Sequence, residues 1–307
     1  MVDDRVAVLV GPTAVGKTAV ALALAAHWPL DVISADSRQV YRRLDIGTAK
    51  PTKKERAKVT HHGLDLVDPG TRYSAGHFAR DATGWISAVQ SAGRMPVVVG
   101  GTGLYVRALA DGLFREPALD PVRRRRLDAW TARLEPIELV RWAGRLDANF
   151  RGGGRQRAAR AIEVALLTGA PLSHWQRAAR ESGTIAPWYI VLTAPRAVLH
   201  ARIARRADEM IQRGLVEEVA SVLADGYQAG TAGLDGIGIR EAVEFLHGRR
   251  PRESVAEAIA TSTRQYAKRQ ETWFRHQLDG PVLTLDATRP PDRIAAEIAE
   301  AWERTRR

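Results

Sequence analysis

Short runs of apolar residues alternate with amphipathic stretches along most of this 307-residue chain. The apolar runs predict six strands, at residues 6–10, 31–34, 63–67, 96–99, 189–192 and 282–285. Between several of them, apolar positions recur with helical spacing and predict helices over residues 17–27, 75–92 and 197–224. Strands that alternate with helices indicate an α/β fold, in which a mostly parallel sheet carries helices on both faces.

The alternation stops between residues 114 and 187, where Arg, Ala, Leu and Trp dominate. This stretch predicts helices interrupted by the string RGGGR at residues 151–155. We therefore predict a core made of residues 1–113 and 188–307, with an all-helical insertion domain at 114–187. A long helix over 255–277 belongs to the core. Ligands of such a sheet bind at the carboxyl ends of its strands, here just after residues 10, 34, 67 and 99.

The first predicted strand runs into the string GPTAVGKT, which fits the phosphate-binding pattern G-x-x-x-x-G-K-T. Glycines at both ends let the backbone N–H groups turn inward, and the next helix presents its N-terminus to the same place. Lys17 adds a positive charge, and Thr18 offers a hydroxyl to a magnesium ion. The predicted cradle for a di- or triphosphate comprises Gly11, Pro12, Thr13, Ala14, Val15, Gly16, Lys17 and Thr18.

Asp36 follows the second predicted strand and faces this cradle, where an acid can position magnesium, act as a base, or simply cap the next helix. The fourth strand runs into Gly100 and Gly101 instead of the acid expected in a hydrolase. That glycine pair permits close approach of a ligand, or forms a plain turn. Asp65 and Asp68 fit either a site or a strand edge.

Two basic stretches also have two interpretations each. Arg202, Arg205 and Arg206 lie within about one helical turn of each other. They form either a lid that neutralises phosphate charge or a solvated helix face. The helix predicted at 255–277 mixes basic and aromatic side chains, as nucleic-acid grooves do, although Trp273 also fits a core position.

The chain is strongly basic, with 46 Lys and Arg against 35 Asp and Glu and a formal net charge of +11. This balance favours a polyanionic partner, or reflects an arginine-rich surface. The absence of cysteine excludes disulfides, cysteine-ligated zinc and a cysteine nucleophile. No apolar run reaches the about 18 residues of a membrane helix, and the acidic start is unlike a signal peptide. We expect a cytoplasmic protein without a membrane partner.

Together these strings resemble one family, the tRNA dimethylallyltransferases, also called tRNA isopentenyltransferases. The matching strings stand in the family's order over roughly residues 5–275: GPTAVGKT, ISADSRQVYRRLDIGTAKP, HHGLDLVDP, YSAGHFARDA, VVVGGTGLYVRAL, RQRAARAIEV, RADEMIQRGLVEEV and TRQYAKRQETWFR. The combination of DIGTAKP with GGTGLY is specific, because a plain phosphate-loop kinase has neither.

The resemblance implies transfer of a dimethylallyl group from its diphosphate to the N6 amine of adenosine 37, beside the anticodon, in tRNAs that read codons beginning with U. Diphosphate is released, Mg²⁺ is the cofactor, and the insertion grips the anticodon arm of a tRNA bound by a monomer. The implied catalytic residues are Asp36 as general base with Lys17, Thr18 and Arg206. The implied tRNA contacts are Asp36, Ser37, Arg38, Gln39, Thr102, Arg124, Gln156, Arg157, Ala158, Ala159 and Arg160.

The chain departs from the family pattern in two places. A string resembling HPND is replaced by residues 151–154, RGGG, and Ile239 stands where an aromatic residue is common. Two other functions remain open on the residues alone. One is a small-molecule or nucleoside kinase, which has no need of GGTGLY or the basic insertion; the other is a non-catalytic RNA-binding protein, which has no need of Lys17, Thr18 and Asp36 together.

Overall fold

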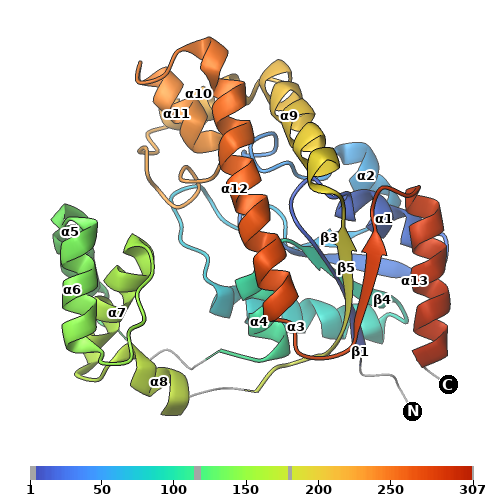
Figure 1. Cartoon of the computed structure of the whole chain (residues 1–307), viewed down its shortest axis with the longest axis horizontal. Helices are drawn as coiled ribbons and strands as arrows, with labels where there is room; N and C mark the ends of the chain where they lie inside the picture. The colour runs from blue at the N-terminus through green and yellow to red at the C-terminus, as the bar shows by residue number, and fades with distance from the viewer. Residues whose placement is uncertain (1–4, 114–118, 179–181, 306–307) are drawn as a thin grey trace. The chain divides into compact units, whose positions relative to one another are not determined.

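The computed structural model describes residues 5–113, 119–178 and 182–305 (Figure 1). The chain divides into two compact units. One unit combines Met1–Ala110 with Thr184–Arg307, and the other is Asp111–Gly183.

The first unit is built on a six-stranded sheet of order β3-β2-β4-β1-β5-β6, and all of its pairings are parallel. The strands are β1 (Arg5–Val10), β2 (Leu30–Ala35), β3 (His61–His62), β4 (Met95–Gly100), β5 (Ala186–Thr193) and β6 (Val282–Asp286). This architecture confirms the α/β prediction. The almost uniformly apolar β1, β2 and β4 suit it, because a parallel strand is covered on both faces.

Helices flank this sheet and include α12, the long helix that Figure 1 draws in orange. They are α1 (Lys17–Leu24), α2 (Lys53–Lys58), α3 (Ala75–Ser91), α4 (Gly103–Ala110), α9 (Arg196–Gln212), α10 (Leu215–Ala224), α11 (Ile239–Leu246), α12 (Val255–His276) and α13 (Pro291–Thr305), with a 3₁₀ turn at Arg252–Ser254. Alternate strand residues such as Ala7, Leu9 and Val97 enter one core cluster, which also contains Leu24 of α1 and Ile298 of α13.

Two predicted elements differ from the structure. The strand predicted at 63–67 is wrong: β3 is only His61–His62, because Gly63 and Asp65 both adopt positive φ and turn the chain away. Val67 instead forms an isolated bridge with Tyr41. The helix predicted at 197–224 is two helices, α9 and α10, because Gly214 between them takes a left-handed conformation.

The second unit contains α5 (Pro121–Arg133), α6 (Pro136–Leu146), α7 (Arg155–Thr168) and α8 (Leu172–Ala178). Its core joins Leu139 and Ala143 of α6 to Ala158 and Ile162 of α7. Arg155 donates to the carbonyl oxygens of Thr131, Ala132 and Leu134 at 2.8, 2.6 and 2.7 Å, and so caps the end of α5. Residues 114–118 and 179–181 of the predicted insertion lie outside the described residues.

Within the three described ranges, no helix is both long and apolar enough to cross a membrane.

Candidate active site

The register of the sheet brings three chain segments together at its carboxyl edge. Val10 of β1 and Ala35 of β2 both pair with Gly100 of β4. The residues that follow, namely the phosphate loop, Asp36 and Gly101, therefore start from neighbouring points. The sheet thus supplies one site from three of the four strand ends that the sequence singled out.

The phosphate loop runs from Gly11 to Gly16, where φ is 110° as the chain enters α1. Nζ of Lys17 donates to the carbonyl oxygens of Gly11 and Pro12 at 2.9 Å each, so the ammonium lies inside the loop. The predicted cradle needs one correction in its donors, because Pro12 has no N–H to offer. The N-terminus of α1 points its unpaired backbone donors to the same place.

Three charged side chains share this region: Lys17, Asp36 and Arg206. Burial lowers the pKa of the Lys17 ammonium to about 8, against the opposing effect of the Asp36 carboxylate, and the charge of Arg206 lowers this pKa further. Burial also lowers the pKa of the Arg206 guanidinium, and the charge of Asp36 opposes this shift. Two cations beside one carboxylate leave an excess of positive charge for an anionic ligand.

The three clustered arginines, Arg202, Arg205 and Arg206, lie on α9 and have separate roles. Arg202 donates to the carbonyl oxygens of Val15 and Ala287 at 2.9 Å each, so it ties the phosphate loop to the residue that follows β6. Arg205 is exposed and pairs with Glu209 at 3.4 Å. Arg206 reaches Oγ1 of Thr13, within the loop, at 3.5 Å. Arg206 therefore lies beside Thr13, and its contact with an anion stays a prediction.

Asp36 leads into a turn that also holds Thr102. Its Oδ1 accepts the backbone N–H of Arg38 at 2.8 Å, which is the local role expected of a capping Asp. The Ser37 N–H donates to Oγ1 of Thr102 at 3.0 Å, and the two hydroxyls are 3.3 Å apart. Thr102 also bonds the hydroxyl of Tyr266, whose pKa is raised to about 12, chiefly by burial and also by Asp36. Asp36, Ser37 and Thr102 thus form one polar group.

A small cavity of about 50 Å³ connects the cradle to this group. Its polar lining includes Lys17, Thr18 and Asp36, and its apolar lining includes Ala21 and Val99. The remaining lining residues are Val32, Ser34, Gln39, Pro51, His61 and Gly100. The cavity therefore places cationic, carboxylate and apolar surfaces next to one another.

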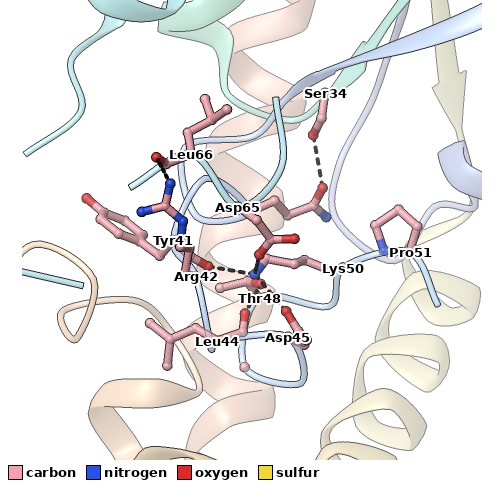
Figure 2. Close-up of polar contacts among 12 residues, drawn as sticks. Ser34, Tyr41, Arg42, Leu44, Asp45, Thr48, Lys50, Pro51, Asp65 and Leu66 are labelled. Atoms are coloured by element: carbon pink, nitrogen blue, oxygen red, sulfur yellow. Dashed lines mark hydrogen bonds and ion pairs between the residues drawn. The ribbon is translucent and has the colours of Figure 1, made fainter. Parts of the chain in front are cut away.

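The segment DIGTAKP, residues 45–51, forms a buried polar network beside the cavity (Figure 2). The Lys50 side chain is 1% exposed, and its Nζ donates to the carbonyl oxygen of Tyr41 at 2.6 Å, to Asp45 at 2.7 Å and to Asp65 at 2.6 Å. Asp65 also pairs with Arg56 at 2.8 Å. Burial opposes ionisation of the Asp65 carboxyl, but Lys50 and Arg56 together hold its pKa below the usual range. Asp65 is thus a structural acid.

Two further contacts fix the same segment. Glu218 of α10 accepts the backbone N–H groups of Asp45, Ile46 and Gly47 at 2.7 to 2.8 Å. Gln39, which lines the cavity, donates to the carbonyl oxygen of Ala49 at 3.2 Å and accepts from Ser34 at 2.9 Å. The network therefore supports one wall of the cavity. Asp68, the other acid left open above, is half exposed and pairs with Arg42 at 3.1 Å.

Two glycines of GGTGLY, Gly101 and Gly103, allow side chains of a helix to approach the backbone closely. A Cβ atom at Gly101 would lie 2.3 Å from Nε2 of Gln270, and one at Gly103 would lie 2.4 Å from the ring of Trp273. Both partners belong to α12. Sequence reasoning missed Gln270, because its contacts bring together residues more than 160 positions apart.

The predicted tRNA contacts are divided between the units. Arg38 pairs with Asp235 and donates to the carbonyl oxygen of Ala232 at 3.0 Å. In the second unit Arg124 and Arg160 both pair with the buried Glu163, whereas Gln156 and Arg157 are exposed on α7 and Ala159 is half-buried. Ala158 is fully buried in the core of that unit, and its contact with RNA stays a prediction.

The oxygen donors at the cradle suit a magnesium ion that is coordinated partly by the protein and partly by a phosphate. Among the described residues, no group of three or more His, Cys, Asp or Glu could hold a metal. The Thr18 side chain lines the cavity beside Asp36, and Mg²⁺ prefers such oxygen ligands with waters and phosphate oxygens completing its shell.

Two family models match the chain. One, described as IPP transferase, covers residues 39–277, and the other, isopentenyl transferase, covers residues 4–65. The chain is 40% identical to a tRNA dimethylallyltransferase of Bordetella petrii, over 95% of this chain and 96% of the relative. It is 43% identical to one of Halorhodospira halophila, over 94% of each.

Solved structures give the same result. The structure is similar to that of a full-length tRNA isopentenylpyrophosphate transferase from Bacillus halodurans, with a TM-score of 0.71 and 33% identity, over 98% of this chain and 96% of that one. It is also similar to a eukaryotic dimethylallyltransferase acting on tRNA, with a TM-score of 0.74 and 25% identity, over 93% of this chain and 74% of that one.

Proposed function

The chain belongs to the family of tRNA dimethylallyltransferases, and we propose that it moves a dimethylallyl group from dimethylallyl diphosphate to the N6 amine of adenosine 37 in tRNAs that read codons beginning with U. It is a prenyltransferase enzyme. The observation that carries the detailed proposal is that Lys17 and Asp36 line one small cavity, with Arg206 close enough to influence the charge of Lys17. A cationic cradle for the leaving diphosphate thus adjoins a carboxylate that can accept a proton.

In the proposed reaction, the amine nitrogen forms a bond to the allylic carbon of the donor while the bond from that carbon to the diphosphate oxygen breaks. The diphosphate leaves with the electron pair, and Lys17 and Arg206 stabilise its growing negative charge. Asp36 accepts the proton released by the amine. The adenine must leave the anticodon-loop stack to reach the cavity.

Mg²⁺ is proposed to bind the Thr18 hydroxyl and diphosphate oxygens. When bound, it would neutralise charge on the leaving group. The other proposed donors to the diphosphate are backbone N–H groups of Ala14 and of Gly16 to Thr18.

The proposal extends to the partners. The exposed Gln156 and Arg157 of α7, with Arg124, Ala159 and Arg160, support contact between the helical insertion and the anticodon arm. Ser37, Arg38, Gln39 and Thr102 are proposed to meet the RNA at the entrance to the cavity. We propose that the enzyme is cytoplasmic, because tRNA is processed and used in the cytoplasm. We also propose that it is a monomer.

The kinase alternative has less support. The relatives compared above are named tRNA dimethylallyltransferases, and β4 runs into Gly100 and Gly101 where a hydrolytic phosphate-loop enzyme would carry an acid. Incubation with unmodified tRNA and labelled dimethylallyl diphosphate, with labelled ATP as a parallel donor, separates the two. We expect label to enter tRNA from the allylic donor alone; phosphate transfer from ATP without prenylation would contradict the proposal.

Asp36→Asn tests the proposed base. The amide oxygen can still accept the Arg38 N–H, so the turn is retained, whereas the amide cannot take up the proton. We expect single-turnover transfer to fall by roughly 10²–10⁴-fold, with the Kd for tRNA within a few-fold of wild type. Near-normal turnover would show that another group accepts the proton.

A further inference from the structure

Gln270 of α12 bridges two loops of the active site with both ends of its side-chain amide. Its Oε1 accepts the backbone N–H of Thr13 in the phosphate loop at 2.8 Å. Its Nε2 donates to the carbonyl oxygen of Gly101, at the end of β4, at 2.7 Å. The residue is only 6% exposed. One buried side chain thus joins the loop that would hold the diphosphate to the loop that holds Thr102.

The chemistry of this bridge selects an amide. Thr13 offers a donor and Gly101 an acceptor, so the bridging side chain must accept at one end and donate at the other. An ionised carboxylate accepts only, and an ammonium donates only. Glutamine satisfies the part-buried Thr13 N–H and the buried Gly101 carbonyl oxygen in a single orientation, and each would otherwise lose this hydrogen bond.

The surroundings of the bridge are fitted to it. A Cβ at Gly101 would lie 2.3 Å from Nε2 of Gln270, so any larger residue displaces the amide. Tyr266, Gln270 and Trp273 stand at positions i, i+4 and i+7 of α12 and therefore share one face of the helix. Tyr266 lies against Thr102, and Trp273 lies against Gly103. Nζ of Lys17 lies 3.6 Å from the position of that Cβ, so the cation of the cradle is a neighbour of the bridge.

We propose that Gln270 is a positioning residue for the transfer reaction. It holds the phosphate loop and the Gly101–Thr102 loop at a fixed separation, so that the leaving diphosphate and the amine beside Asp36 and Thr102 lie in line across the allylic carbon. The Thr13 N–H belongs to this bridge, which leaves the diphosphate to the other amides of the loop. This inference rests on the proposed function and adds a residue that touches neither reactant.

Gln270→Met tests the proposal, because methionine has a similar length but makes neither hydrogen bond. Gln265→Met is the matched control, since Gln265 is exposed on the same helix. We expect kcat/KM for the donor to fall by about 10²-fold in Gln270→Met, because small displacements of reacting groups are costly. The Kd for tRNA should stay within about twofold, and the control should match wild type in every assay.

Calorimetric titration with inorganic pyrophosphate separates this inference from the proposed function. We expect the Kd for pyrophosphate to rise roughly tenfold in Gln270→Met, whether or not the wild-type protein transfers a dimethylallyl group. Failure of the wild-type protein to transfer this group would refute the proposed function alone. A pyrophosphate Kd and a donor kcat/KM within twofold of wild type would overturn the role of Gln270. So would an equal loss of tRNA and pyrophosphate affinity, which would indicate general misfolding.

A double-mutant cycle gives a second route that does not depend on the fold of one variant. Gly101→Ala displaces the amide from the opposite side. If both changes act by breaking the same bridge, the Gly101→Ala/Gln270→Met double variant loses no more than about twofold beyond the worse single variant. Losses in kcat/KM that multiply would contradict a shared bridge.

Discussion

Lys17 is a residue whose ionisation is changed by its burial in the site. It lies inside the phosphate loop with its Nζ on two carbonyl oxygens, and its burial lowers the pKa to about 8. An anion in the cradle favours the charged ammonium and raises this pKa again. The affinity for an anion therefore depends on pH near and above 8.

We predict that the affinity for inorganic pyrophosphate, measured without magnesium, falls as pH rises from 7 to 9. Lys17 is protonated below its pKa of about 8 and loses its charge above this pH. The affinity for the anion should therefore fall as the pH rises. Relative to Lys17→Arg, whose guanidinium stays charged, the loss should be roughly tenfold. Parallel pH profiles for the two proteins would show that Lys17 does not titrate in this range.

Some site residues could be predicted from the sequence and others could not. Gly11, Gly16, Lys17 and Thr18 are contiguous, and their strand–loop–helix context carries the meaning of the motif. Which arginine of α9 faces the cradle depends on the rotation of that helix about its axis. Gln270 has no local signal, because its two partners are brought to it by the sheet and the packing of α12.

At the scale of elements, the segment 45–51 is held by contacts from several directions. Lys50 binds Tyr41, Asp45 and Asp65, and Glu218 binds three successive amides. The sequence motif marked this segment as specific to the family, and its role is to support the wall formed by Gln39 and Pro51. Spacing alone could not pair Lys50 with Asp65, because the chain between them turns at positive φ.

We predict that Lys50→Met lowers the free energy of unfolding by about 3 kcal/mol, since it leaves the carbonyl oxygen of Tyr41 without its donor, Asp45 without its cation and Asp65 with Arg56 alone. Thermal unfolding should shift down by roughly 5–10 °C. Lys54→Met is the control, because Lys54 is exposed on α2, and its effect should stay within about 0.5 kcal/mol. Equal stability of the two variants would mean that the Lys50 network is not stabilising.

At the scale of the whole molecule, the two units have separate cores and the chain carries a net charge of +11. The alternation of strands and helices predicted the fold of the first unit, because the period of apolar positions follows directly from burial in a parallel sheet. The predicted third strand is the exception, since the turns at Gly63 and Asp65 are decided by their contacts and not by hydropathy.

We predict that tRNA binding weakens steeply with salt, because neutralised phosphates release counterions. A plot of log K against log salt should have a slope of about −3 or steeper. Arg157→Gln should make the slope shallower by roughly one, whereas Arg304→Gln on α13 should not change it. A slope near zero would show that the basic surface does not contact the RNA backbone.

The most direct test of the account is to locate the transferred group in the RNA. Two transcripts of one tRNA, with adenosine or guanosine at position 37, would be incubated with the enzyme, magnesium and dimethylallyl diphosphate, then digested and examined by mass spectrometry. We expect N6-(dimethylallyl)adenosine from the first transcript, at position 37 alone, and no prenylated nucleoside from the second. Prenylation at other positions, or of both transcripts alike, would contradict it.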